Sequence, residues 1–199
     1  IPQQTPIYDN KLDEIITLLK NAKRPVIVAG YGLKITKTEQ FLLDIIEEYN
    51  IPVVTPKNGL DTIWEDHPML GGRIGINGQR AGNLTVQNAD LTLVLGSRLA
   101  LVTVGYETDL FAPNAKKILV DCDKAQLDYS WINLDLKVFA DLREFMPALV
   151  KKLKDENYSY DYQFWTKKVQ GYRKKYPTVT KEVIEKKKYV DSYFFFERL

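Results

Sequence analysis

Residues 25–30, PVIVAG, form a short apolar run that is rich in β-branched side chains and ends in glycine. Such a run is typical of a parallel strand that is covered on both faces. Apolar residues at helical spacing precede it at 10–23 and follow it at 38–49. A second strand-like run, IPVVT, comes next at 51–55. Strand, helix and strand in this order predict a right-handed parallel crossover unit.

The same alternation continues along the chain after a glycine-rich stretch. A helix is expected over 80–88, strands at 90–96, 116–121 and 136–141, and a further helix from 141 to 153. This order predicts an α/β fold, a Rossmann-like open parallel sheet with helices on both faces. Ligands bind such sheets at the carboxyl ends of the strands. We therefore expect any site in the segments that follow the strands, namely GYGL, TPKNG, GSRL and DCDK.

Composition and charge exclude several classes of partner. Twenty-eight basic residues face 26 acidic ones, and the net charge of +2 indicates neither a nucleic-acid nor a membrane partner. The single cysteine, Cys122, rules out an internal disulfide framework. No apolar run approaches the roughly 20 residues that span a bilayer. These features predict one main domain in a cytoplasmic protein.

Two glycines, Gly30 and Gly32, follow the first predicted strand. The dinucleotide-binding fingerprint needs a third glycine at position 35 and an acid at the end of the second strand. The chain has Ile35 and Thr55 at these places. The pattern disfavours a stand-alone NAD-dependent enzyme, although that alternative stays open. The two glycines either turn the chain tightly or let a ligand phosphate approach the backbone.

The glycine-rich stretch MLGGRIGINGQRAGN spans residues 69–83. So many glycines argue against a regular element, so we expect a loop here, with a helix that begins near Gln79. Backbone amides at the start of that helix are able to bind an anion or a cofactor phosphate. A packed structural loop is the alternative.

Three charged residues come directly after predicted strands. The planar guanidinium of Arg98 suits a phosphate or a flavin carbonyl, and a surface ion pair is the alternative. Asp121 and Asp141 are able to accept hydrogen bonds from a ribose or adenine. A turn-forming role for Asp121 and a helix cap for Asp141 are the structural alternatives.

Other candidate residues lack the neighbours that chemistry requires. His67 has no second histidine or cysteine nearby, so a structural role is expected. Cys122 follows a buried strand without a base beside it, which predicts a small core residue rather than a nucleophile. No nucleophile elbow, P-loop or metal-binding motif occurs in the sequence.

The run GRIGINGQRAGNLTVQNADLTLVLGSRL at 72–99 resembles the central domain of acetolactate synthases, pyruvate oxidases and related decarboxylases. The glycine-rich loop and the motifs AxNL, QNADL and GSRL occur in the order and spacing of that family. The resemblance extends through RPVIVAGYGL, IPVVTPKNGLD, ILVDCDKAQL and FADLREFMPALVKKL.

This resemblance implies a division of the chain into four parts. Residues 9–154 correspond to the central domain, and residues 1–8 to a linker that precedes it. Residues 155–188 correspond to a helix and a linker. Residues 189–199 correspond to the start of a C-terminal diphosphate-binding domain that is otherwise missing.

The family also implies an enzyme with thiamine diphosphate and Mg²⁺ held by a pyrimidine-binding and a diphosphate-binding domain. The chain has no GDG sequence, the motif of the diphosphate-binding domain, so it is expected to carry no catalytic residue and to be inactive alone. In the intact enzyme the cofactor would attack a 2-keto acid, release CO₂ and pass the carbanion to a carbonyl or a proton. The implied partners are the two missing domains and further subunits of a homo-oligomer.

In flavin-containing members of the family the central domain holds FAD. Leu101 and Val102 stand where acetolactate synthases typically have an aspartate and an arginine. Losing a charged donor costs about 1–3 kcal/mol, so weak or absent binding of FAD or ADP and a structural role are expected. A working FAD or ADP module is the alternative. The positions that match the family's flavin contacts are Gly30, Gly32, Gly75, Gly78, Arg98, Asp121 and Asp141.

Overall fold

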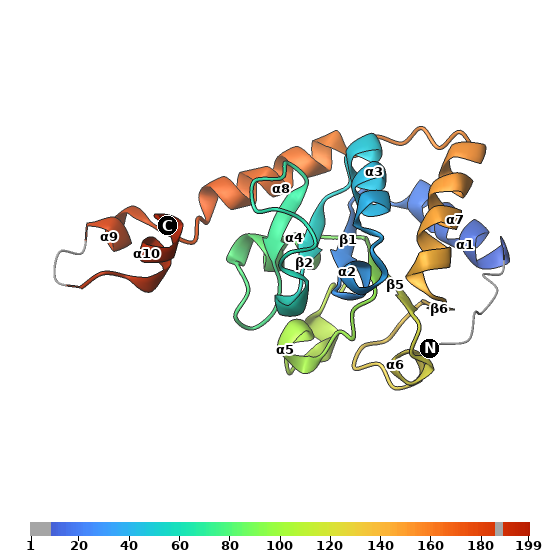
Figure 1. Cartoon of the computed structure of the whole chain (residues 1–199), viewed down its shortest axis with the longest axis horizontal. Helices are drawn as coiled ribbons and strands as arrows, with labels where there is room; N and C mark the ends of the chain where they lie inside the picture. The colour runs from blue at the N-terminus through green and yellow to red at the C-terminus, as the bar shows by residue number, and fades with distance from the viewer. Residues whose placement is uncertain (1–8, 186–188) are drawn as a thin grey trace.

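The computed structural model describes residues 9–185 and 189–199 (Figure 1). In this part of the chain six strands form one sheet in the order β3-β2-β1-β4-β5-β6, and every pair is parallel. The predicted open parallel α/β sheet is therefore confirmed. The strands are β1 (Pro25–Ala29), β2 (Val53–Thr55), β3 (Leu70–Arg73), β4 (Leu91–Leu95), β5 (Lys116–Asp121) and β6 (Leu136–Phe139).

The strand order places helices on both faces of the sheet. The chain runs outward from β1 to β3, then returns to β4 beside β1 and continues the other way. Because parallel crossovers are right-handed by rule, the helices that connect β1 to β2 and the helix that connects β3 to β4 lie on opposite faces. The helices are α1 (Asp9–Asn21), α2 (Gly32–Thr36), α3 (Glu39–Tyr49), α4 (Arg80–Gln87), α5 (Leu101–Val104), α6 (Lys124–Asp128), α7 (Leu142–Asp155), α8 (Gln163–Lys175), α9 (Lys181–Ile184) and α10 (Ser192–Glu197), with short 3₁₀ turns η1 (Lys57–Gly59) and η2 (Thr108–Leu110).

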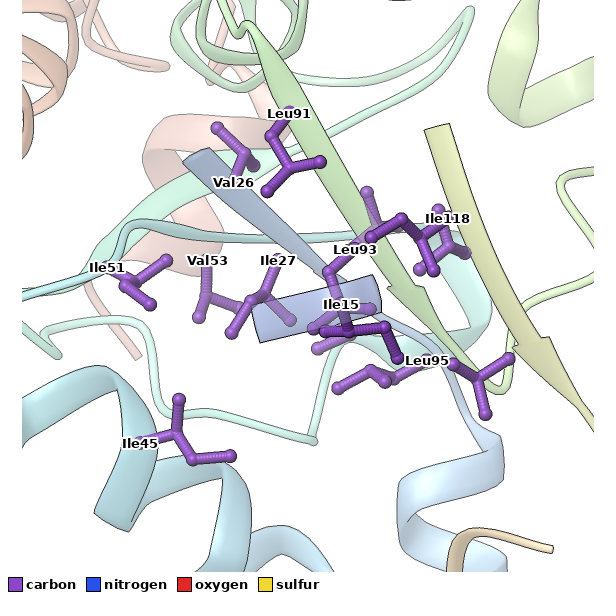
Figure 2. Close-up of a cluster of buried hydrophobic side chains, with 14 of the residues drawn as sticks. Ile15, Val26, Ile27, Ile45, Ile51, Val53, Leu91, Leu93, Leu95 and Ile118 are labelled. Carbon is purple, nitrogen blue, oxygen red and sulfur yellow. The ribbon is translucent and has the colours of Figure 1, made fainter. Parts of the chain in front are cut away.

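The helices form two packed groups. The first consists of α1, α2 and α3 with α7, and in the second α4 and α8 pack against each other and against β3. Every residue of β1 and β4 is buried, as expected for central strands covered on both faces. Figure 2 shows part of the resulting core, which includes Ile15, Val26, Ile27, Ile45, Ile51, Val53, Leu91, Leu93, Leu95 and Ile118.

The glycine-rich stretch contains a strand that the sequence did not predict. The first residues of 69–83 form β3, so the expectation of a loop throughout is wrong there. A Cβ on Gly71 would lie 3.0 Å from Cγ1 of Val169, which explains why a residue without a side chain occupies the strand beneath α8. The rest of the stretch is a loop, and α4 follows Gln79 as expected.

Helix α8 belongs to the packed structure although it lies beyond residue 154. Trp165 is 1% exposed, and its Nε1 donates a hydrogen bond to the carbonyl of Pro25 at 3.1 Å. The hydroxyl of Tyr162 donates to the carbonyl of Leu19 at 2.7 Å. These contacts tie α8 to the start of β1 and the end of α1.

The chain beyond α8 has a different character. The orange α8 leads to the red α9 and α10, which lie away from the sheet (Figure 1).

The linker predicted at 1–8 and residues 186–188 lie outside the described residues. The boundaries predicted at residues 154 and 188 remain predictions. No described helix is both long and apolar enough to cross a membrane.

Candidate functional site

The candidate site lies at the carboxyl edge of the sheet, where the strand order reverses between β1 and β4. Ligands of open α/β sheets bind outside this reversal point. Each residue predicted from the sequence either ends a strand or follows one, so the fold brings all seven to this edge. What they can bind depends on whether their donors and acceptors are free.

The loop after β1 packs directly on the end of β4. The amide of Gly30 donates to the carbonyl of Leu95 at 2.9 Å, and the amide of Gly32 donates to the carbonyl of Gly96 at 3.0 Å. A Cβ on Gly30 would lie only 2.2 Å from the Gly96 oxygen. Both amides are therefore engaged with protein, and close backbone contact fills this part of the crevice. The arrangement matches the tight-turn alternative.

The loop after β3 is held in the same manner. The amide of Gly75 donates to Oδ1 of Asn83 at 2.9 Å, and Nδ2 of Asn83 donates back to the Gly75 carbonyl at 3.0 Å. Gly78 donates its amide to the same carbonyl at 2.9 Å. Gly75 has φ of +119°, and a Cβ there would lie 2.6 Å from the carbonyl oxygen of Val102. These amides therefore stabilise a packed structural loop.

Among the three charged candidates, Arg98 and Asp121 have fewer protein partners than Asp141. Arg98 is exposed and forms no ion pair within the part of the chain that the structure describes. Asp121 is 9% exposed, and its Oδ1 accepts a hydrogen bond from the amide of Asp123 at 2.9 Å. Burial raises the pKa of the Asp121 carboxyl, and the positive charge of Arg98 opposes that rise. The hydrogen bond from the amide of Asp123 is the one expected if Asp121 forms a turn, as its structural alternative proposed.

Asp141 is the N-cap of α7, as its structural alternative anticipated. Its Oδ1 accepts hydrogen bonds from the amide and from Nε of Arg143, at 2.9 and 3.0 Å. A third bond joins Oδ2 to Nη2 of the same arginine at 2.5 Å. The hydrogen bond from Arg143 holds the pKa of this carboxyl below its usual range. The carboxylate therefore already has protein donors on both oxygens.

Cys122 is exposed, so the prediction of a core residue is wrong. The buried strand β5 ends one residue earlier, and the chain turns outward at the cysteine. Partial burial of the thiol, together with the charges of Asp121 and Asp141, raises its pKa. The thiol is thus protonated at neutral pH, which argues against a nucleophile.

His67 is structural, as predicted. It is 1% exposed, its Nδ1 accepts a hydrogen bond from the amide of Met69 at 3.0 Å, and its Nε2 lies 3.0 Å from Oε1 of Glu47. Because Nδ1 is an acceptor, Nε2 carries the proton and donates to Glu47. Across the described residues, no group of three or more His, Cys, Asp and Glu side chains is placed to hold a metal ion.

Two residues that shape this edge were given no role by the sequence analysis. Gly96 has φ of +59°, and a Cβ there would lie 2.8 Å from Cα of Gly32. Asn83 holds the loop after β3 through both atoms of its amide. Both belong to motifs quoted from the sequence, GSRL and AxNL, so the signal was present without its structural meaning.

Comparison with known proteins identifies the class. Residues 12–149 match the family model of the thiamine pyrophosphate enzyme central domain. The chain therefore belongs to the thiamine pyrophosphate (thiamine diphosphate) enzyme family, of which it carries the central domain.

Individual relatives narrow the resemblance. The chain is 31% identical to a probable acetolactate synthase large subunit of Methanococcus aeolicus, over 73% of this chain and 24% of that protein. It is 31% identical to the acetolactate synthase large subunit of Lactococcus lactis, over 85% and 28%. It is 27% identical to 3D-(3,5/4)-trihydroxycyclohexane-1,2-dione hydrolase of Clostridium perfringens, over 77% and 24%. The chain thus spans about a quarter of the length of these relatives.

Proposed function

We propose that this chain is the scaffold domain of a thiamine-diphosphate-dependent 2-keto-acid decarboxylase or carboligase and contributes no catalytic residue. One observation carries the proposal. The amides of all four predicted cofactor-binding glycines are donated to protein acceptors, so these residues build the fold at the edge where a ligand would bind. Family membership and acetolactate synthases among the relatives support the enzyme class.

The described residues do not fit thiamine diphosphate itself. Its diphosphate is held through Mg²⁺ in this family, and these residues include no cluster of three side chains able to hold a metal ion. We therefore assign the cofactor to pyrimidine-binding and diphosphate-binding domains of a longer polypeptide. The relatives are long enough to contain such domains. We propose further that the longer polypeptide is cytoplasmic, forms a homo-oligomer and binds neither nucleic acid nor membranes.

Calorimetric titration of the chain with thiamine diphosphate and Mg²⁺ tests this assignment. We expect no heat beyond dilution, and no release of CO₂ when pyruvate is added. The same titration with a polypeptide that includes the two flanking domains is the positive control. Saturable binding of the cofactor to the chain alone would contradict the proposal.

A second candidate function is a nucleotide site at the same edge, favoured by Arg98 and Asp121. A buried carboxyl with a raised pKa, on which an exposed guanidinium acts electrostatically, is the kind of arrangement found at functional sites. A ligand there would contact these two side chains without the four engaged amides. Substitution of Arg98 by alanine would then weaken its binding, which separates this candidate from the scaffold function.

A further inference from the structure

The charged side chains of helix α8 are all positive. The helix contains no acidic residue and five basic ones, Lys167, Lys168, Arg173, Lys174 and Lys175. Arg173 is engaged, because its Nη2 donates to Oε1 of Glu65 at 3.0 Å. The four lysines are exposed, and none of them forms an ion pair within the part of the chain that the structure describes. The outer face of α8 therefore carries uncompensated positive charge.

The charged side chains of helix α3 are all negative. The helix contains no basic residue and four acidic ones, Glu39, Asp44, Glu47 and Glu48. Glu39 pairs with Lys34 at 3.4 Å, and Glu47 lies against His67. Asp44 and Glu48 are exposed one helical turn apart, and neither forms an ion pair with another described residue. The outer face of α3 therefore carries uncompensated negative charge.

The two helices meet where α3 ends and α8 begins. The amide of Tyr162 donates to the carbonyl of Tyr49 at 3.1 Å, and the hydroxyl of Thr166 donates to the carbonyl of Asn50 at 2.5 Å. Figure 1 shows the orange α8 leading away from the light-blue α3 at this junction. One partner surface is therefore able to cover both helices. The outer faces of α3 and α8 together are called the α3/α8 surface below.

Two further features of α8 favour a protein as the partner. Phe164, in the first turn, is 86% exposed. Gly171 lies in the middle of the helix, and a Cβ there would meet nothing within 4 Å, so packing within the chain does not require a glycine. Aromatic side chains are typical anchors of protein interfaces, and a glycine lets another molecule approach the backbone closely.

The arrangement of the charges makes the α3/α8 surface complementary to itself. In a two-fold symmetric dimer each contact occurs twice, so α3 of each copy lies opposite α8 of the other copy. A surface of a single sign would repel its own copy, whereas a surface with an acidic and a basic half attracts it. Both signs that such a contact needs are present in this one chain.

We propose that a second copy of this chain docks on the α3/α8 surface. Asp44 and Glu48 of each copy then face Lys168 and Lys174 of the other across a two-fold axis. Phe164 adds an apolar contact beside the charges. Exposed ion pairs contribute little individually, so the dimer is weak and sensitive to salt. The contact is made by this domain alone and is independent of the scaffold role and of a nucleotide site at Arg98.

Sedimentation velocity of the full chain at increasing concentration measures this association. In a buffer of low ionic strength the mean sedimentation coefficient is expected to rise from the value of a monomer toward that of a dimer. Raising the ionic strength from about 0.05 M to about 0.5 M should weaken the association at least about tenfold, because salt screens exposed charges.

Two charge-reversed variants test which faces pair. The first variant combines Lys168→Glu with Lys174→Glu, and the second combines Asp44→Lys with Glu48→Lys. Each variant alone should associate at least about tenfold more weakly than the parent, because like charges then face each other. An equimolar mixture restores every proposed pair, with the signs exchanged in one of the two contacts. The mixture should therefore associate more tightly than either variant alone.

The control is Lys124→Glu with Lys137→Glu, which changes the net charge as the first variant does. Both lysines are exposed, and they belong to α6 and β6 rather than to the α3/α8 surface. This variant should associate within about twofold of the parent. Circular dichroism of each variant establishes that it is folded.

Four results would overturn the proposal. A parent chain that stays monomeric at low ionic strength would leave the α3/α8 surface to a different protein, such as a flanking domain of a longer polypeptide. Association that resists both salt and charge reversal would instead point to exposed aromatic side chains such as Tyr193 and Phe196 of α10. A mixture no tighter than its components would refute the pairing of α3 with α8, and growth beyond a dimer would refute the two-fold arrangement.

Discussion

Gly30 and Gly96 bring the ends of two neighbouring strands into backbone contact. An alanine at position 30 would place its Cβ 2.2 Å from the Gly96 carbonyl oxygen, and this oxygen cannot move without separating β1 from β4. Gly30→Ala is therefore expected to lower the free energy of unfolding by about 2–4 kcal/mol. Urea unfolding followed by circular dichroism measures this loss.

The matched control is Gly171→Ala in α8. A Cβ there would meet nothing within 4 Å, and alanine favours a helix by about 0.5–1 kcal/mol over glycine. This variant should be slightly more stable than the parent chain. If Gly30→Ala were equally well tolerated, the close packing of the two loops would be refuted.

Asp121 is expected to reduce stability at neutral pH. Burial raises the pKa of its carboxyl in the folded state. Below the unfolded pKa, about 3.9, the carboxyl is protonated in both states and costs no stability. As pH rises through the folded pKa the buried carboxyl ionises, and the stability of the folded state falls. Asp121→Asn keeps the oxygen that accepts the amide of Asp123 and removes the charge. The variant should be at least as stable as the parent at pH 7, with any advantage shrinking below about pH 4. Urea unfolding at pH 7 and pH 3 gives the comparison.

Asp141 should show the opposite sign at neutral pH. Arg143 lowers the pKa of its carboxyl, so the stabilisation is present above the unfolded pKa and is lost as pH falls through the folded pKa. Asp141→Asn should therefore be less stable than the parent at pH 7, and the difference should shrink in acid. A deficit that stayed constant from pH 7 to pH 2 would show that the charge of Asp141 is not responsible.

At the scale of elements, α8 is expected to be part of the cooperative unit. Trp165 and Val169 are fully buried, and loss of a buried tryptophan alone costs about 3–5 kcal/mol. A chain that ends at residue 155 should therefore be at least about 3 kcal/mol less stable, or unfolded. Trp165→Ala provides the same test in the full chain. Thermal unfolding followed by circular dichroism reports both.

A chain that ends at residue 181 is the control for this truncation. Helix α9 has no buried residue, and no described residue beyond position 181 is classed as buried. This shorter chain should keep the parent stability within about 0.5 kcal/mol. Equal stability of the chain that ends at 155 would instead place the limit of the folded unit before α8.

Most elements could be predicted because each carries its own pattern. The buried strands β1 and β4 are uninterrupted apolar runs, and α3 and α7 have apolar residues at helical spacing. β3 was not predicted because its glycines give no side-chain pattern. The need for glycine at position 71 is seen only in the structure, where α8 packs over the strand. The end of β5 was predicted correctly at residue 121, but Cys122 was misplaced because the sequence did not show that the residue directly after the strand is exposed.

The position of the candidate site could be predicted from the sequence, but not whether its backbone amides are free to bind a ligand. Parallel strands bring their carboxyl ends to one edge, so the segments after them were predictable from strand order. Whether the amides of Gly30 and Gly32 are free depends on their hydrogen bonds to the carbonyls of Leu95 and Gly96, which are distant in the sequence. Such loop-to-loop hydrogen bonds leave no local pattern, and the tight-turn and ligand-binding interpretations of Gly30 and Gly32 therefore stayed open.

At the scale of the whole molecule, the chain is the central domain of a thiamine diphosphate enzyme and spans about a quarter of the length of its relatives. Its parallel sheet offers the usual position for a nucleotide, but the glycine amides there already donate to backbone carbonyls and to the side chain of Asn83. The central claim is therefore that this domain contributes structure rather than a nucleotide site.

Thermal unfolding of the chain with FAD, ADP, NAD or buffer alone, at matched concentrations, tests that claim most directly. A ligand present at 100 times its dissociation constant adds about 2.7 kcal/mol to the stability of the folded state, which is readily seen as a higher Tm. We predict no rise in Tm with any of the three nucleotides. A rise with FAD or ADP that Arg98→Ala abolishes would contradict the account and establish a working nucleotide site at the carboxyl edge.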